Sequence, residues 1–441
     1  MSGQVVTADL VWTGRRFEPD VALRVDEAGR IAAIGSDAAG TAAEPTRRLA
    51  RRALLPGFVN AHSHAFQRGL RGRGETFPEG AGSFWTWRDA MYELVSTLDE
   101  ERFYELCLQA FREMLACGMT AVGEFHYLHH AGESRDFALD AVVLAAAADA
   151  GIRLALLEVY YATGAIGRPL AGSQRRFACA SVDEYWRQLD RLQGLLDPRT
   201  QSLGVVAHSI RAATLDDVAA LYAGACERGL PFHMHVEEQR QEVASAVEAY
   251  GRRPMGLLNA RLAISPRFTA IHCTHTEPAD LARFLKAGGR VCLCPLTEAN
   301  LGDGIADLPA ILAAGGEICL GSDTNDRIAM TEEMRWLEYV QRLARERRGV
   351  CLDGEGVVGR RLLEASTAGG AAALGIAAGA IEAGRWADFV ALDLDAPSLK
   401  GADADSLLDA FVFGGRDDAV AEVCVGGRWL AAGPSSRPAF R

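Results

Sequence analysis

The chain has 441 residues, of which 49% are hydrophobic and 24% charged, and its formal net charge at pH 7 is −12. These fractions are typical of a folded globular protein. The carboxylate excess argues against a nucleic-acid partner, because phosphate binding needs clustered lysine and arginine. No secretory signal or membrane-spanning run is visible, and the ten cysteines are scattered as reduced thiols would be, so we expect a cytoplasmic protein.

Short alternating segments at both ends of the chain predict one small β domain. Near the start they are ALRV from residue 22 and IAAI from residue 31, and near the end FVAL from residue 389 and VCV from residue 423. Glycine-containing turns separate these segments. We therefore expect residues 1–54 and 385–441 to form one composite β-sandwich domain.

Residues 55–384 alternate short apolar runs with longer amphipathic segments, such as 101–117, 215–228 and 278–287. This alternation is typical of repeated βα units and a parallel sheet. Eight runs are expected to be strands: 55–62, 120–125, 153–160, 202–208, 231–236, 268–272, 290–295 and 317–322. Eight strands with intervening helices predict an α/β fold, a closed (β/α)8 TIM-like barrel.

Most of the ten histidines fall at or just beyond the carboxyl end of an expected strand. In a barrel, this face carries the active site. His62 and His64 are two residues apart, so a strand points both rings to the same side. Later strand ends add His233 or His235 and Asp323. Three imidazoles and one carboxylate form a donor set suited to zinc or another divalent metal, with one position open to water.

The His-x-His pair, the later histidine and the last-strand aspartate together resemble the metal-binding pattern of the amidohydrolase superfamily. The resemblance implies one Zn²⁺ per chain, or another divalent metal, with ligands His62, His64, His235 and Asp323. It also implies that His272 contacts the attacking water molecule. His208, rather than a lysine, stands at the fourth strand end, which favours a mononuclear site of the deaminase kind.

A finer resemblance rests on five segments in the same order along the chain. They are NAHSHAFQR from residue 60, FWTWR from 84, GEFHYLHH from 123, AHSIR from 207 and HVEEQ from 235. Together they resemble formimidoylglutamate deiminases, a family that converts N-formimidoyl-L-glutamate to N-formyl-L-glutamate and ammonia in histidine degradation. The resemblance implies substrate contacts at Gln67, Arg88, Tyr127, His208 and Arg211.

The expected reaction is attack of a metal-activated water molecule on the amidine carbon. Asp323 is expected to accept the proton of this water molecule, and His272 to orient it and stabilise the tetrahedral adduct. Glu238 is expected to carry a proton to the leaving nitrogen. When the segment HVEEQ is aligned with the family's segment, the catalytic glutamate falls on Glu238 and not on Glu237. Glu237 stands where the family pattern has a small residue.

Arg88 and Arg211 favour a small anionic amidine as substrate, because guanidinium groups bind carboxylates bidentately. Two alternatives stay open at this point. One is a sibling deaminase acting on a nucleobase or triazine ring, and the other is an inactive barrel used for binding. We also expect a homodimer without nucleic-acid or membrane partners. The sequence assigns no role to His126, His129, His130 or His275.

Overall fold

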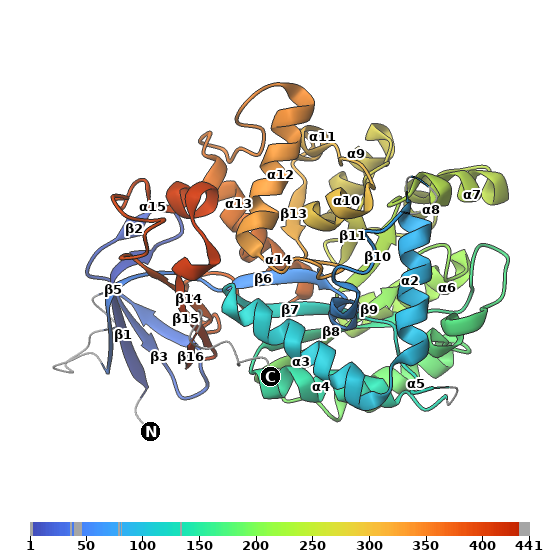
Figure 1. The fold of residues 1–441 in the computed structure, drawn as a ribbon, viewed down its shortest axis with the longest axis horizontal. Coiled ribbons are helices and arrows are strands. Elements are labelled where there is room, and N and C mark those ends of the chain that lie inside the picture. Colours follow the sequence, from blue (N-terminus) through green and yellow to red (C-terminus); the bar gives the residue numbers. More distant parts are fainter. Residues whose placement is uncertain are drawn as a thin grey trace.

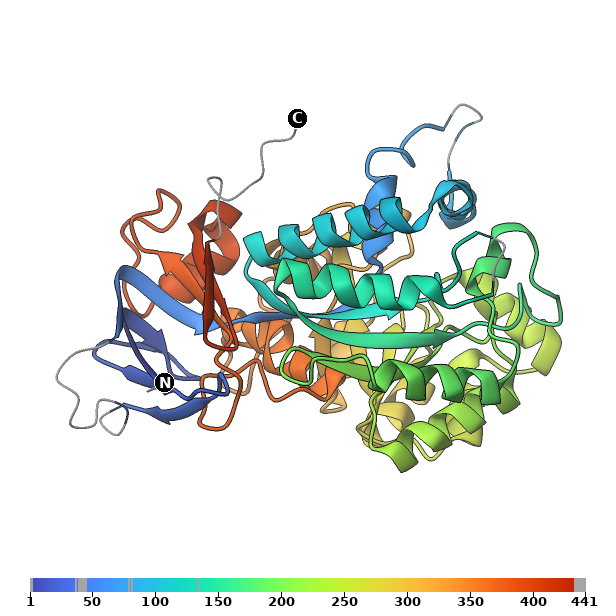
Figure 2. The ribbon, with the colours of Figure 1, turned by 90° about the horizontal axis from the view of Figure 1, so that it is seen from below.

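The computed structural model describes residues 3–35, 38, 46–77, 80, 82–132 and 135–431. It contains a barrel and a smaller sheet, which lie side by side (Figure 1). The view turned by 90° shows the same arrangement (Figure 2). The smaller sheet combines strands from both ends of the described chain. The fold class predicted from the sequence, an α/β barrel with a small β domain from both chain ends, is therefore confirmed.

The barrel consists of eight parallel strands that follow one another in chain order. Nearly all their residues are buried, because helices cover the outer face. The strands are β6 (Phe58–Ser63), β7 (Met119–His126), β8 (Arg153–Tyr160), β9 (Gln201–Ala207), β10 (Phe232–Val236), β11 (Phe268–His272), β12 (Arg290–Leu293) and β13 (Glu317–Leu320). The Asp323 amide donates to the His62 carbonyl (3.0 Å), and the His64 amide donates to the Asp323 carbonyl (2.9 Å). These bonds close the barrel and bring three candidate site residues together.

Helices surround the barrel, and side-chain caps stabilise the first turns of some of them. The Asp99 carboxylate accepts from the Arg102 amide before α3, and the Thr214 hydroxyl accepts from the Asp217 amide before α6. The longer helices are α2 (Phe84–Thr97), α3 (Glu100–Ala116), α4 (Ala138–Ala150), α5 (Val182–Gln193), α6 (Leu215–Arg228), α7 (Arg240–Tyr250), α8 (Pro254–Arg261), α9 (Pro278–Lys286), α12 (Met330–Arg345) and α13 (Val358–Ser366). Shorter ones are α10 (Pro295–Leu301), α11 (Leu308–Ala313), α14 (Ala368–Leu374), α15 (Leu407–Asp409), η1 (Ala65–Leu70), η2 (Gly172–Phe177), η3 (Ala410–Gly414) and η4 (Asp417–Ala419). Within the described ranges, none of the helices has the length and apolar character needed to cross a bilayer.

The smaller sheet has its own apolar core, which includes Val6, Leu23 and Phe389. Its strands are β1 (Gln4–Trp12), β2 (Phe17–Glu18), β3 (Ala22–Val25), β4 (Ile31–Ile34), β5 (Arg47–Pro56), β14 (Phe389–Asp393), β15 (Val420–Val425) and β16 (Arg428–Ala431). Apart from the parallel pair β1 and β5, the strands pair antiparallel. The expected domain boundary after residue 54 falls inside β5.

The chain passes from one sheet to the other at Gly57, which corrects the strand expected at 55–62. Leu55 and Pro56 pair with β14 in the smaller sheet, and the barrel strand begins only at Phe58. A Cβ atom on Gly57 would lie 2.0 Å from Thr120 Oγ1, so this close approach requires glycine. The apolar pattern could not show the change, because both sides of Gly57 are buried strands.

A buried ion pair connects the barrel to the smaller sheet. The Arg153 guanidinium of β8 donates to both carboxylate oxygens of Asp388, at 2.7 and 3.0 Å. Asp388 Oδ1 also accepts from the Gly426 amide at 2.7 Å. Asp388 lies just before β14, so the ion pair fixes the smaller sheet against one side of the barrel.

Candidate active site

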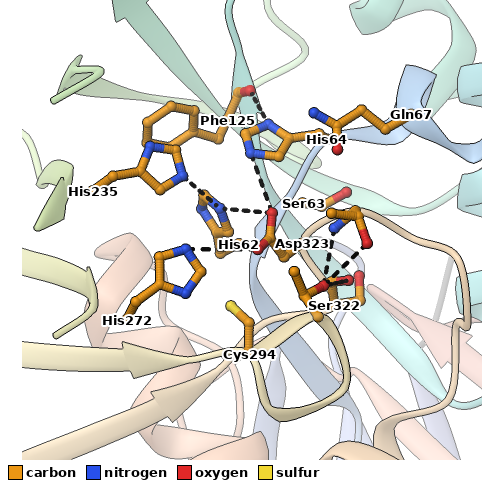
Figure 3. Close-up of polar contacts among 12 residues, drawn as sticks. His62, Ser63, His64, Gln67, Phe125, His235, His272, Cys294, Ser322 and Asp323 are labelled. Atoms are coloured by element: carbon orange, nitrogen blue, oxygen red, sulfur yellow. Dashed lines mark hydrogen bonds and ion pairs between the residues drawn. The ribbon is translucent and has the colours of Figure 1, made fainter. Parts of the chain in front are cut away.

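Four imidazoles and one carboxylate converge at the carboxyl ends of the barrel strands (Figure 3). Asp323 Oδ1 lies 3.4 Å from His62 Nε2 and 3.3 Å from His64 Nε2. His235 Nε2 lies 3.2 Å from His62 Nε2, and His272 occupies the adjacent strand end. Donor atoms of a tetrahedral zinc site, with bonds of about 2.0–2.2 Å, lie roughly 3.3 Å apart. These side chains therefore fit a divalent metal ion.

The second ring nitrogen of two of these histidines fixes their orientation. His64 Nδ1 lies 3.0 Å from the Phe125 carbonyl oxygen, and His235 Nδ1 lies 3.1 Å from the His208 carbonyl oxygen. Both contacts leave Nε2 directed at the shared centre. His233, the other histidine of β10, faces outward and contacts the carbonyl oxygen of Ala373 in α14 at 2.8 Å. Of the two histidines in β10, His235 is therefore the one in the donor set.

Burial keeps three of the four converging imidazoles, those of His62, His64 and His235, neutral. It lowers the pKa of His64 to about 3, and the neighbouring His62 adds to this effect. Burial also lowers the pKa values of His62 and His235 well below the usual histidine range. Neutral imidazoles are the form that binds a metal ion.

His272 has a different electrostatic environment. Its Nδ1 lies 3.3 Å from Glu298 Oε1, and its Nε2 lies 3.6 Å from Asp323 Oδ2 and 3.9 Å from Glu238 Oε1. Burial lowers the pKa of His272, but the hydrogen bond with Glu298 and the charges of Glu238 and Asp323 outweigh it and raise the pKa to about 10. His272 is therefore suited to donating a hydrogen bond into the site.

Glu237 and Glu238 point in different directions after β10. Glu238 faces the site, where its Oε2 accepts from Arg211 Nη2 at 3.1 Å. Glu237 Oε1 instead accepts from the Met255 amide of α8 at 3.0 Å, and its Oε2 lies 3.8 Å from Arg253. Of the two carboxylates, only that of Glu238 can reach a molecule bound at the site.

All five expected substrate contacts line a single pocket above the converging imidazoles. Its polar lining residues are His64, Gln67, Arg88, Tyr127, His208, Arg211, His235, Glu238, Asp323 and Thr324. Its walls include Phe84, Trp87, Met91, Tyr92, Tyr161 and Phe177. Gln67 Nε2 donates to the Tyr127 hydroxyl at 2.6 Å, which fixes these two side chains relative to each other. The pocket thus combines apolar walls with a few oriented polar groups, as small-molecule sites do.

The two arginines of the pocket have different surroundings. Arg211 pairs with Glu238 and also lies 3.4 Å from Glu242 Oε2. Arg88 Cζ lies 4.2 Å from the Trp85 ring centre, and its buried Nε has no hydrogen-bond partner among the residues the structure describes. No carboxylate of the described chain pairs with Arg88, so this stacked cation is available to a ligand carboxylate.

Sequence reasoning missed three residues close to the pocket. Glu298 of α10 accepts from the Cys294 amide at 2.9 Å and contacts His272, while Glu242 of α7 faces Arg211. The sulfur of Cys294 lies within 4.8 Å of donor atoms of His272 and Asp323. In the sequence, only the position of Cys294 and Glu298 shortly after the seventh barrel strand indicates that they lie near the active site.

Backbone strain also gathers at these strand ends. Glu237, His272, Cys273 and Asp323 have φ angles of +54°, +70°, +54° and +48°, a region that residues other than glycine rarely adopt. Such conformations persist where the surrounding structure enforces them, and they cluster at functional sites. The strain therefore supports the assignment of this end of the barrel as the active site.

A (β/α)8 barrel with such a donor set at its strand ends defines a class of metal-dependent hydrolases, and the chain belongs to it. Residues 53–430 match the Amidohydrolase family, so this protein is a member of that family. The chain is 41% identical over 417 residues to formimidoylglutamate deiminase from Pseudomonas aeruginosa, covering 93% of this chain and 91% of that protein. The finer resemblance predicted from five sequence segments is thereby confirmed.

Two further proteins are similar to this chain at lower sequence identity. A 5-methylthioadenosine/S-adenosylhomocysteine deaminase from Natronomonas pharaonis is 29% identical over 451 residues, which cover 100% of this chain and 95% of that protein. A crystal structure of an amidohydrolase from Brucella melitensis is 34% identical, with a TM-score of 0.88 and coverage of 98% of this chain and 95% of that one. The similarity extends over the barrel and the small β domain.

Proposed function

We propose that this chain hydrolyses N-formimidoyl-L-glutamate to N-formyl-L-glutamate and ammonia. The observation that carries the proposal is one pocket in which a metal-binding donor set, Glu238 and the arginines Arg88 and Arg211 face the same space. The 41% identity to a formimidoylglutamate deiminase supports the same substrate.

His62, His64, His235 and Asp323 would hold one divalent ion at this site. The three imidazoles and one carboxylate favour zinc over magnesium or calcium, which prefer oxygen ligands. When bound, such an ion lowers the pKa of a water molecule, so that hydroxide is available near neutral pH.

The side chains around this position supply the proton transfers. Asp323 accepts the proton of the attacking water molecule, and His272 Nε2 donates a hydrogen bond to the oxygen that adds to the amidine carbon. Glu238 delivers to the departing nitrogen the protons that the attacking water molecule gives up, two in all, so that the =NH group becomes ammonia. The carbon–nitrogen bond breaks, ammonia leaves, and the formyl group remains on the glutamate nitrogen.

The two arginines are proposed to bind the two carboxylates of the substrate, with Gln67, Tyr127 and His208 adding hydrogen bonds. Burial and the charge of Arg211 lower the pKa of His208 well below its usual value. His208 is therefore a neutral hydrogen-bonding group and does not compete with the arginines as a cation.

Replacing either arginine with methionine is expected to lower kcat/KM by at least about tenfold, because a charge-assisted hydrogen bond contributes about 1.5–3 kcal/mol. The parent, Arg88→Met and Arg211→Met should each be assayed with formimidoylglutamate and with its α-amide and γ-amide. An arginine that binds a given carboxylate loses its effect when that carboxylate is an amide, so the double-mutant cycle isolates the contact.

Arg175→Met is the matched control, because Arg175 of η2 is exposed and does not line the pocket. It should leave kcat/KM for all three substrates unchanged. If the Arg88 and Arg211 variants still distinguish acid from amide as strongly as the parent does, the arginines do not bind the substrate carboxylates.

The pocket also favours one alternative, a deaminase acting on a nucleobase or triazine ring, because Phe84, Trp87 and Tyr161 could stack on a heterocycle. Two guanidinium groups have no obvious role with a neutral ring. A direct comparison of substrates separates the two functions.

Three sequence-based expectations stay predictions. They are a cytoplasmic location, a homodimer, and a division into a β domain of residues 1–54 and 385–441 and a barrel domain of residues 55–384. Light scattering of the purified protein would test the homodimer.

A further inference from the structure

Four titratable side chains cluster between the outer face of the barrel and α4. The proposed reaction uses none of them. They are His126 at the end of β7, His129 in the following loop, Asp140 of α4 and Glu158 of β8, and none is more than 1% exposed. Strand alternation explains their position, because Phe125 faces the candidate active site and the next residue, His126, faces outward. Helix α4 packs against this part of the barrel (Figures 1 and 2).

The donor atoms of this cluster lie close to the separations found among metal ligands. His126 Nε2 and His129 Nδ1 lie 2.9 and 3.0 Å from Asp140 Oδ1, and His129 Nδ1 lies 3.4 Å from Glu158 Oε1. One donor atom from each of the four residues lies within 4.8 Å of all the others. Tetrahedral zinc ligands are roughly 3.3 Å apart, so a small movement would place all four around one ion.

Further hydrogen bonds orient these donors. His129 Nε2 contacts the Val159 carbonyl oxygen at 2.8 Å, which leaves Nδ1 facing the cluster. Gln188 Nε2 donates to Asp140 Oδ2 at 2.5 Å, which leaves Oδ1 facing it. Among the described residues, neither carboxylate oxygen of the fully buried Glu158 has a hydrogen-bond partner. Metal-binding side chains are commonly oriented in this way by their other polar atoms.

The charge balance of this cluster is compatible with a divalent cation. In the part of the chain that the structure describes, Asp140 and Glu158 form ion pairs only with His126 and His129, and no lysine or arginine compensates them. Without a metal ion, protons have to balance these two buried carboxylates. Burial raises the pKa of Glu158 well above its usual value, and the charges of Glu158 and Asp140 outweigh burial and raise the pKa of His129. A divalent cation bound by two neutral imidazoles and two carboxylates leaves no net charge. We propose that His126, His129, Asp140 and Glu158 form a second, structural site for a divalent transition-metal ion such as zinc.

Such an ion would connect α4 to β7 and β8 behind Phe125 and Tyr127, which contact the candidate active site. Because the cluster is buried, the ion would bind during folding and leave only on unfolding. The inference is independent of the proposed reaction. It adds one ion to the single zinc ion per chain expected from the sequence.

Metal analysis of variants tests the second site. The parent, purified from zinc-supplemented cells, should contain two equivalents of metal per chain, and the double variant His62→Ala/Asp323→Ala should contain one. Adding Glu158→Gln to this double variant should remove the last equivalent. Glu317→Gln is the matched control, because Glu317 is the exposed first residue of β13, and it should retain both equivalents.

A second measurement does not depend on any variant. Native mass spectrometry of the parent after prolonged treatment with a chelator should show one ion retained per chain. A colorimetric zinc indicator should detect its release only when guanidinium unfolds the protein. If the folded double variant contains no metal and the chelated parent retains none, the cluster is a proton-sharing hydrogen-bond network and the proposal is wrong.

Discussion

Replacing Glu238 with glutamine is expected to lower kcat by a factor of about 10²–10⁴, the usual contribution of a positioned acid–base group. Glutamine has the same shape and can still accept a hydrogen bond from Arg211, which lies 3.1 Å from Glu238. It cannot take up and release a proton, so KM and the metal content should stay close to the parent values. Steady-state kinetics with metal analysis measures all three quantities.

Glu237→Gln is the matched control, because it removes a carboxylate charge one residue away. Glu237 contacts the Met255 amide and Arg253 and does not line the pocket. The variant should lose thermal stability and keep its kcat. The opposite pattern, with an inactive Glu237→Gln and an active Glu238→Gln, would assign the proton transfer to Glu237.

Replacing Asp323 with alanine is expected to remove one equivalent of metal and to abolish measurable turnover. Asp323 lies 3.3–3.4 Å from the Nε2 atoms of two histidines and would serve both as ligand and as base. Loss of a residue that only orients a ligand weakens metal binding by about 10–100-fold, so loss of the ligand itself should exceed this range. Metal analysis and an ammonia assay on the same sample measure both effects.

Asp395→Ala is the control, since Asp395 is an exposed aspartate that pairs with Arg51 on the smaller sheet. It should retain full metal content and full activity. Full metal occupancy at the strand ends of both Asp323→Ala and His62→Ala would show that these residues do not bind the metal.

The sequence predicts much of this fold because barrel strands are buried on both faces and therefore appear as short apolar runs between amphipathic helices. The same pattern locates the strand ends, and the carboxyl ends of parallel strands meet on one face of a barrel. The neighbouring His62 and His64 and the distant Asp323 could therefore be assigned to one site before their distances were known.

Contacts that depend on how helices pack against the strand ends could not be predicted in this way. Glu298 and Glu242 lie on helices, and nothing in their neighbouring residues indicates that they face His272 and Arg211. The outward cluster of His126 and Asp140 likewise forms only when α4 packs against β7.

Ammonia release tests the central claim most directly. Zinc-loaded parent protein should be assayed against N-formimidoyl-L-glutamate, N-formimidoyl-L-aspartate, guanine and cytosine under identical conditions. Because each carboxylate contact is expected to contribute about 1.5–3 kcal/mol, kcat/KM for formimidoylglutamate should exceed that for either nucleobase by at least about 100-fold. A higher kcat/KM for guanine or cytosine than for formimidoylglutamate would contradict the proposed function.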